Sequence, residues 1–293
     1  MVWSTEKRNA RSMDIDLHNS LEIVSIINEE DNLVAAAVKE ELPQIALAVD
    51  KIVEAIQKQG RLIYLGAGTS GRLGVLDASE CPPTYGTEPE LVQGIIAGGN
   101  YALTNAVENV EDSTEQVIQD LQEIQFGKLD ILVGIAASGR TPYVLAGLKY
   151  AKELGASTVA VVTNKNTPVG AEAEVEIAVE VGPEVITGST RMKSGTAQKM
   201  VLNMLSTAAM VRLGKVYGNL MVDVKTANKK LYSRAERILM QATGIDEAEA
   251  KHLLSQCDYH VKTAIVMALK ECDASEARER LDVAKGYIRE ALS

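Results

Sequence analysis

A short apolar run in this chain breaks into glycines and then becomes helical. Residues 61–74 read RLIYLGAGTSGRLG, in which residues 62–65 have the pattern of a buried strand and residues 66–71 form a Gly/Ser/Thr turn. The first turn of a helix offers free backbone amides and the positive end of the helix dipole, and glycines let an anion approach them. Thr69 and Ser70 add hydroxyl donors. The stretch favours a phosphate-binding turn, and a turn that needs glycine for its geometry alone is the alternative.

Two further loops strengthen the first interpretation. Residues 131–135 (ILVGI) lead into AASGRTP, which carries Ser138 and Thr141 and is followed by another apolar helical pattern. A third loop, TGSTRMKSGT, carries Ser189 and Thr190, opens a long helix at residue 192 and lies just after Glu184, which could reach the same site. A capping segment needs one Ser or Thr rather than several. We therefore expect the ligand to be a phosphorylated small molecule.

The pattern of the whole chain predicts an α/β fold. Apolar strands are expected at residues 62–65, 91–97, 129–135, 157–163 and 175–181. Helices are expected at residues 21–59, 101–124, 143–153, 192–213 and 219–243. Strands that alternate with helices indicate a parallel sheet covered on both faces, whose ligands bind beyond the carboxyl ends of the strands. Both SG loops come at that position.

The predicted domains are an N-terminal arm with helices (1–50), a ligand-binding domain (51–218) and a helical C-terminal domain (219–293). In the last domain, short helical runs at 247–256, 261–271 and 274–292 follow the helix at 219–243, and Asp246 and Asp273 are candidate N-caps. These runs predict a small three-helix bundle.

Composition excludes several classes of partner. The formal net charge is −10 and aromatic residues make up 4% of the 293 residues, which disfavours nucleic acid and anionic membranes. No apolar run reaches transmembrane length, no leader pattern is present, and the three cysteines show no CxxC spacing. We expect a cytoplasmic protein.

Because no histidine lies between His18 and His252, a His-based metal site or acid/base group in the central region would need a terminal segment or a second subunit. Otherwise proton transfer there falls to carboxylates, Lys, Tyr or Cys.

Two carboxylates are candidates for chemistry. Glu80 comes just before Pro82-Pro83, which predicts that it ends a helix, where the helix dipole disfavours a carboxylate and a purely stabilising role. An exposed Glu at a helix end is the alternative. Glu111 lies in an acidic run on the predicted helix 101–124, and such a run is most often a solvated face.

The three loops together resemble the sugar isomerase (SIS) domain, a phosphosugar-binding α/β fold. With LDASECPPTYG and GKVYGNLMVDV added, the chain closely resembles the N-acetylmuramic acid 6-phosphate etherase family from about residue 14 to its end. The resemblance implies a three-layer sandwich with a ubiquitin-associated-like helical tail, no metal or other cofactor, and a homodimer. The nearest functional neighbour is the glucokinase regulatory protein, which senses phosphosugars without catalysis.

The resemblance also implies an activity and site residues. The family cleaves the D-lactyl ether of N-acetylmuramic acid 6-phosphate, giving N-acetylglucosamine 6-phosphate and D-lactate in recycling of cell-wall amino sugars. Its two catalytic glutamates fall on Glu80 and Glu111. Its phosphosugar contacts fall on the loop residues Thr69, Ser70, Ser138, Thr141, Ser189 and Thr190.

An elimination fits these residues, with Glu80 as the acid that protonates the departing lactate oxygen and water adding back afterwards. Which carboxylate removes the C2 proton stays open. Two rivals also stay open: a phosphosugar sensor, which would need neither glutamate, and an aldose–ketose isomerase, which would leave the ether intact.

Overall fold

The computed structural model describes residues 3–223 and 229–293 and contains two compact units. The first unit comprises residues 1–79 and 89–206, and the second comprises residues 80–88 and 207–293. Two long helices, α3 (Gly68–Tyr85) and α8 (Lys193–Arg212), begin in the first unit and end in the second.

The first unit is built on a five-stranded parallel sheet in the order β2-β1-β3-β4-β5. Its strands are β1 (Leu62–Gly66), β2 (Val92–Ile96), β3 (Ile131–Ala136), β4 (Ser157–Val162) and β5 (Val175–Ala178). All five predicted strands are confirmed. Every residue of β1 and β3 is buried, as the two-sided covering of a parallel sheet requires.

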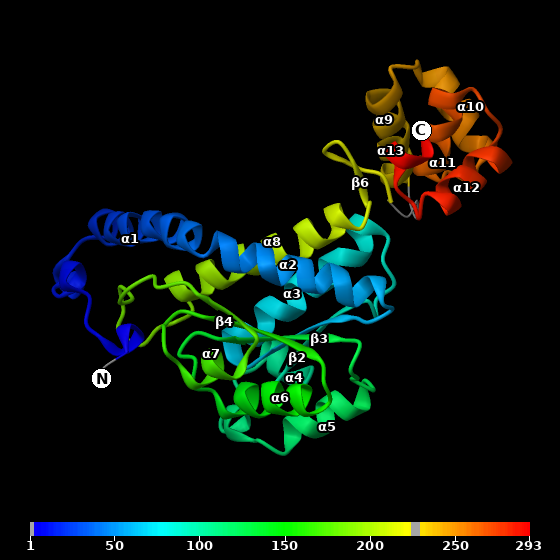
Figure 1. The fold of residues 1–293 in the computed structure, drawn as a ribbon. Helices are drawn as coiled ribbons and strands as arrows, with labels where there is room; N and C mark the ends of the chain where they lie inside the picture. Colours follow the sequence, from blue (N-terminus) through cyan, green and yellow to red (C-terminus); the bar gives the residue numbers. More distant parts are fainter. Residues whose placement is uncertain (1–2, 224–228) are drawn as a thin grey trace. The chain divides into compact units, whose positions relative to one another are not determined.

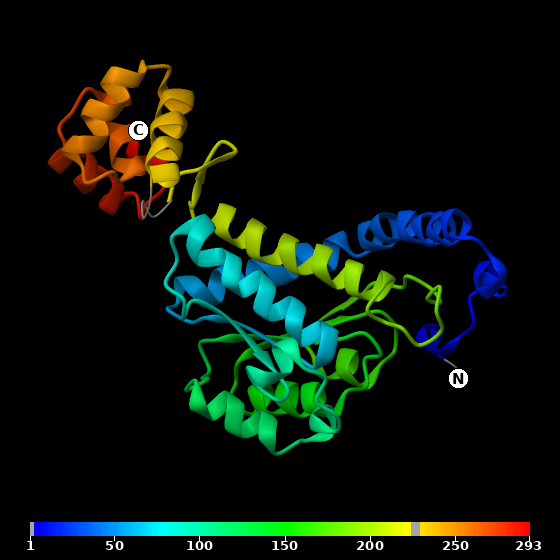
Figure 2. The ribbon, with the colours of Figure 1, turned by 180° about the vertical axis from the view of Figure 1, so that it is seen from behind.

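Helices cover both faces of this sheet. Figure 1 shows α2 (Leu42–Gln57), α3 and α8 on one face, and α5 (Gln116–Glu123) and α6 (Pro142–Glu153) on the other; Figure 2 shows the same layers from behind. Along β1, Tyr64 donates a hydrogen bond to Asp77 of α3 (2.9 Å), while Ile63 and Leu65 join an apolar cluster with α5 and α6. The alternation of side chains along a strand produces these two cores, and the predicted three-layer α/β fold is confirmed.

Two predicted helices are interrupted. The helical stretch 21–59 is divided into α1 (Ser20–Glu40) and α2, because Pro43 in the first turn of α2 cannot continue a preceding helix. The predicted helix 101–124 is wrong: it consists of α4 (Tyr101–Thr104), the 3-10 turn η4 (Val110–Asp112) and α5. Asn105 is extended and Asn109 is left-handed (φ 64°), so the helical ladder cannot pass through them. The short helix α7 (Pro168–Glu172) was not predicted.

The second unit is helical apart from a small hairpin. Its elements are β6 (Val216–Tyr217), β7 (Leu220–Met221), α9 (Lys229–Thr243), α10 (Glu247–Gln256), α11 (Val261–Lys270), α12 (Ala274–Val283) and α13 (Ile288–Ala291). The predicted helix 219–243 is therefore wrong at its start, where the hairpin turns at Gly218 (φ 58°), and residues 224–228 lie outside the described residues. The predicted run 274–292 is divided at Lys285 and Gly286, both with positive φ.

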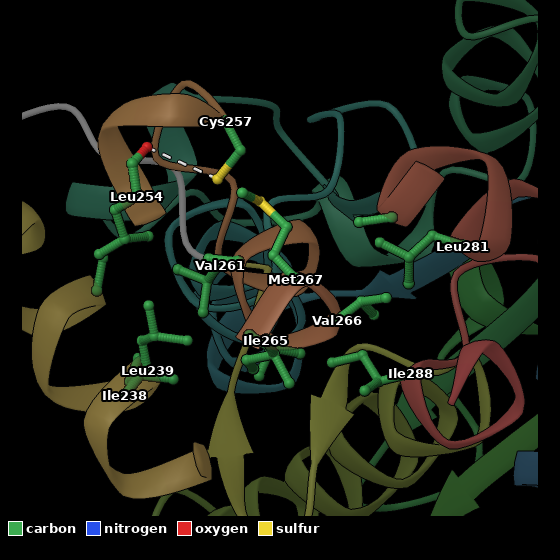
Figure 3. Packing of buried hydrophobic residues seen from close by; sticks show 14 of the residues in the cluster. Ile238, Leu239, Leu254, Cys257, Val261, Ile265, Val266, Met267, Leu281 and Ile288 are labelled. Carbon is green, nitrogen blue, oxygen red and sulfur yellow. Dashed lines mark hydrogen bonds between the residues drawn. The ribbon is translucent and has the colours of Figure 1, made fainter. Parts of the chain in front are cut away.

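The bundle packs around α11. Figure 3 shows Val261, Ile265 and Val266 of this helix among buried side chains of α9, α10, α12 and α13. Both predicted caps are confirmed: Asp246 accepts from the amide of Glu249 (2.9 Å), and Asp273 accepts from the amides of Ser275 and Glu276.

Across residues 3–223 and 229–293, no helix combines the length and the apolar character that a membrane span needs. The same residues bring no three His, Cys, Asp or Glu side chains together in a way that could hold a metal ion.

Candidate functional site

The first loop and the second loop lie side by side because β1 and β3 are paired, with Gly66 opposite Ile135. Parallel strands end at the same edge of a sheet, so the helices that follow them begin there. Gly66 has to be glycine, because a Cβ at this position would stand 2.7 Å from the amide nitrogen of Gly71. The chain can therefore turn directly from β1 into α3.

The first loop contacts the third. Ser70, in the first turn of α3, is buried and donates its hydroxyl hydrogen to Oε1 of Gln198 on α8 (3.0 Å). The half-buried Thr69 lies against Gly195, where a Cβ would stand 3.5 Å from its methyl group. The structure therefore brings Thr69 and Ser70 to the start of α8.

The second loop is linked to the third through Thr163. Gly139 has φ 68°, and Ser138 accepts from the amide of Arg140 (3.3 Å). Thr163, at the end of β4, donates to the carbonyl of Ala137 (2.9 Å) and lies 3.3 Å from the hydroxyl of Ser194. All three hydroxyl-rich loops thus meet at the carboxyl edge of the sheet.

The helices that begin at this edge differ in whether a side chain accepts hydrogen bonds from their first backbone amides. Thr141 is the N-cap residue of α6 and makes no side-chain capping bond. At α8, the carboxylate of buried Glu184 accepts from the amides of Lys193 and Ser194 (2.9 Å each). Glu184 reaches the third loop as expected, but it occupies amides that a free helix start would offer to a phosphate. Ser189 and Thr190 lie half-buried just before these amides.

Lys193 ties the third loop to the N-terminal segment. Its buried ammonium pairs with Glu30 of α1, and Arg11 lies 3.3 Å from the same carboxylate. Burial is the largest single influence on Glu30 and opposes its ionisation, but hydrogen bonds from Lys193 and Asn9 and the charges of Lys193 and Arg11 together hold its pKa below the usual value. The cation of Lys193 is therefore engaged within the protein.

The predicted N-terminal arm lies on the second loop. Ser4 donates from its amide to Oδ1 of Asn164 (3.0 Å), and Asn164 donates to the carbonyl of Ala137 (3.2 Å). Arg140, next to Ser138, pairs with Glu6 (3.3 Å) and stacks over the ring of Trp3 at 5.8 Å. The arm thus holds the one arginine of the second loop.

Glu80 does not end a helix as predicted. Helix α3 continues through Pro82 and Pro83 to Tyr85, so Glu80 lies within it, exposed to solvent. Two successive prolines each remove one hydrogen bond of the helix, but both rings have the helical φ, and the remaining bonds carry the helix for one more turn. Because α3 continues for more than one turn after Glu80, the helix dipole does not disfavour this carboxylate as it would at the helix end. Glu80 belongs to the second unit.

Glu111 lies in the 3-10 turn η4 and not on a helix face, and its side chain is exposed. The segment before it is held by Arg72 of α3, whose guanidinium donates to the carbonyls of Ala102, Leu103 and Asn105 (2.6–2.9 Å). The acidic run does not lie on one helix face, because the chain between α4 and α5 is not α-helical.

Sequence reasoning missed Gln198, Thr163 and Asn164. Gln198 comes four residues after Ser194, so a shared helix face could have indicated it. Thr163 and Asn164 directly follow the β4 strand pattern, the position from which side chains reach a ligand in a parallel sheet.

Comparison with curated proteins covers nearly the whole chain. N-acetylmuramic acid 6-phosphate etherase of Clostridium beijerinckii is 57% identical over 289 residues, which is 99% of this chain and 95% of that protein. The enzyme of the same name from Aliivibrio fischeri is 56% identical over 99% of this chain and 96% of its own length. The chain belongs to the N-acetylmuramic acid 6-phosphate etherase family. It is thus a member of a family of enzymes.

Domain families and solved structures agree on the fold of this etherase family member. The SIS domain model matches residues 103–208, and the glucokinase regulatory protein N-terminal SIS domain model matches residues 44–152. The C-terminal lid domain of the glucokinase regulatory protein matches residues 218–263. A solved structure of an E. coli CFT073 protein has a TM-score of 0.50 and 19% identity over 67% of this chain and 93% of its own.

Proposed function

We propose that this chain cleaves the D-lactyl ether of N-acetylmuramic acid 6-phosphate, giving N-acetylglucosamine 6-phosphate and D-lactate. The identity of 57% over 99% of the chain carries the proposal. The three hydroxyl-rich loops at the carboxyl edge of the sheet support it, because a sugar phosphate needs many donors and this acidic chain supplies them locally.

In this proposal the loops bind the substrate. The phosphoryl group and sugar hydroxyls accept from hydroxyls and free amides at the starts of α3 and α6. Ser138 and Thr141 are suited to this role because they stand at a helix start without a capping side chain. The proposed substrate-binding residues are Thr69, Ser70, Ser138, Thr141, Ser189 and Thr190.

The proposed reaction is an elimination followed by a hydration. In the open-chain sugar a base removes the C2 proton, which is acidic beside the C1 aldehyde. The C3–O bond then breaks, its electron pair leaves with lactate, and Glu80 protonates that oxygen. Water adds to C3 of the unsaturated aldehyde, and a proton returns to C2. Glu111 serves either the proton removal or the water addition.

Labelled water tests the reaction. The protein is incubated with N-acetylmuramic acid 6-phosphate in deuterated, ¹⁸O-labelled water, and the products are analysed by mass spectrometry. Lactate release with deuterium at C2 and ¹⁸O at C3 is expected. Deuterium exchange without lactate would indicate an aldose–ketose isomerase instead.

Matched glutamate variants test the two catalytic assignments. We expect Glu80→Gln to lower turnover by about 10²–10⁴-fold, the usual contribution of one acid step, while binding of the product persists. Glu90→Gln, at another exposed glutamate, is the control. Glu111→Gln is compared with exposed Glu115→Gln; if both turn over and exchange the C2 proton at the wild-type rate, Glu111 is only a surface residue.

A phosphosugar sensor is the second candidate, and the two matches to glucokinase regulatory protein domains favour it. A sensor would bind N-acetylglucosamine 6-phosphate saturably and release no lactate from the muramic acid derivative. The same labelled-water experiment therefore separates it from the etherase.

We also propose that the chain acts as a homodimer. Leu17, Leu21 and Val24 are 80%, 73% and 56% exposed and lie on the arm and the first turns of α1. Leu21 and Val24 are three residues apart on α1 and share one face of it, and Leu17 lies in the 3-10 turn just before this helix. A second copy could cover these exposed apolar side chains. Leu21→Asp should yield a monomer by light scattering, whereas Val283→Asp, at an isolated residue 81% exposed, should not. Equal masses for both variants and the wild type would exclude this face.

The charge of the proposed substrate indicates where the protein works. A phosphorylated sugar crosses a membrane poorly because its charge would have to be buried, so we place the enzyme in the cytoplasm, which cell fractionation can test.

Residues 51–218 are proposed as the phosphosugar-binding domain, preceded by the arm and helices of 1–50 and followed by the helical domain 219–293.

A further inference from the structure

The side-chain amide of Gln198 has a hydrogen-bond partner at its oxygen but none at its nitrogen. It lies on α8, is 1% exposed, and its Oε1 accepts from the hydroxyl of Ser70 (3.0 Å). Its Nε2 is buried and has no hydrogen-bond partner among the described residues. A buried amide nitrogen carries two N–H donors, and folded proteins rarely leave such donors unmatched.

A second polar contact between the same helices leaves no buried polar atom without a partner, so joining α3 to α8 does not explain the unpaired nitrogen of Gln198. Further along α3, Asp77 accepts from Tyr64, from Asn203 (2.8 Å) and from Ser206 (3.2 Å). That cluster joins α3 to α8, and none of its side chains has a buried polar atom that lacks a hydrogen-bond partner. Gln198 differs because it lies at the ends of these helices where the loops meet.

The chemistry of Ser70 explains why a donor is needed beside it. Its hydroxyl hydrogen points to Gln198, so Ser70 presents only lone pairs to a ligand. A phosphoryl dianion accepts hydrogen bonds and cannot donate them. If the amide of Gln198 is turned over, Nε2 donates to Ser70 and frees the hydroxyl hydrogen for the ligand. In both arrangements the pair keeps two hydrogens to donate: both N–H groups of Nε2 in the first, and one N–H with the Ser70 O–H in the second.

We propose that Gln198 is a substrate-binding residue that acts with Ser70 as one donor unit for the phosphoryl group of the sugar phosphate. The inference rests on the proposed function, and it adds a residue of α8 to the loop residues already assigned. Thr69, which lies against Gly195 one turn before Gln198, places the same part of α8 beside the first loop.

Binding measurements test the proposal. Dissociation constants for N-acetylglucosamine 6-phosphate are measured by calorimetry for the wild type, Gln198→Leu, Gln198→Met and Gln198→Glu. The first two should raise Kd about tenfold, the effect of one lost hydrogen bond to a charged group. Gln198→Glu, which is nearly isosteric, should raise it further because its charge repels the phosphate. Gln57→Glu, exposed on α2, is the control for added charge and should leave Kd unchanged.

Kinetics separate binding from folding. With N-acetylmuramic acid 6-phosphate, KM should rise while kcat at saturation changes little, and melting temperatures identify any variant that is merely unstable. Ser70→Ala combined with Gln198→Leu should weaken binding less than the two single effects multiplied, as expected for one unit.

Wild-type turnover distinguishes the two ways to fail. If the wild type releases lactate and folded Gln198→Leu and Gln198→Met both bind as tightly as it does, Gln198 is not a substrate contact and the inference is wrong. If the wild type neither binds the sugar phosphate nor releases lactate, the proposed function is wrong and the inference falls with it.

Discussion

The same dipeptide, Thr-Pro, begins two helices of the first unit and is used in two ways. At α7, Thr167 is the N-cap residue and accepts from the amide of Gly170 (3.0 Å), with Pro168 in the first turn. At α6, Thr141 is the N-cap residue before Pro142, but its side chain makes no capping bond. Proline suits the first helical position at both starts, because no amide hydrogen is needed there.

The difference teaches that a helix start can serve either the fold or a ligand. The start of α7 is filled by Thr167 and closed in by Glu176, whose carboxylate occupies the place that a Cβ on Gly170 would take. The start of α8 is filled by Glu184. The start of α6 keeps its threonine hydroxyl and amides for another partner, which under the proposed function is the sugar phosphate.

Glu184→Ala should produce the largest change at a filled start. It leaves the buried amides of Lys193 and Ser194 without their acceptors, and we expect a loss of about 3 kcal/mol in the free energy of unfolding. Urea denaturation measures it. Glu180→Ala removes an exposed glutamate paired with Lys165 and should cost at most about 1 kcal/mol. Equal losses for both would mean that the carboxylate is not needed at α8.

Thr141→Val should affect binding at the open start. Valine keeps the shape but removes the hydroxyl, so Kd for N-acetylglucosamine 6-phosphate should rise about tenfold, by roughly 1.4 kcal/mol. Stability should change by less than about 0.5 kcal/mol, since no capping bond is lost. A clear loss of stability with unchanged Kd would reverse the roles of Thr141 and Thr167.

Thr167→Val is the complementary change at the filled start. It removes the capping bond to Gly170 and should cost about 1 kcal/mol in stability. The isosteric valine keeps the contact with Gly139 of the second loop, so binding should be retained. Calorimetry measures Kd and thermal melting measures stability for this variant and for Thr141→Val. If the two variants changed Kd and stability alike, the division of roles between Thr141 and Thr167 would be refuted.

Glu176→Gln should have the smallest effect, and its sign depends on pH. Burial, with a smaller contribution from Glu41, raises the pKa of Glu176 in the folded protein. The folded state then holds this proton more tightly than the unfolded state, so stability falls as pH rises through the titration. The neutral amide should therefore be more stable than the wild type at pH 7–8, and the gain should disappear in acid. Glu174→Gln, at an exposed glutamate paired with Lys51, should show no such gain.

Much of the fold could be predicted because its signals are local. The five strands are apolar runs bounded by glycine or polar turns, and Asp246 and Asp273 cap the helices that follow them. The errors came where a local rule met a tertiary constraint. Pro82 and Pro83 predicted the end of α3, and the alternation of strands and helices predicted one helix across residues 101–124.

The candidate site could be predicted in part. The loop residues Thr69, Ser70, Ser138 and Thr141 come together because they follow paired strands, which the order of elements already implied. The pairing of Ser70 with Gln198 could not be read from the chain, since 128 positions separate the two residues. The site roles of Glu80 and Glu111 remain predictions from the resemblance.

The sequence by itself determined the class of fold, the position of the loops at the carboxyl edge of the sheet and the family of the chain. These depend on hydrophobic periodicity and on glycine and hydroxyl patterns, which act over a few residues. Only the tertiary structure decided which helices have their first backbone amides hydrogen-bonded to a side chain. Whether Glu184 caps α8, or Thr141 leaves α6 open, depends on which side chains packing brings within hydrogen-bond distance, and no local rule encodes that.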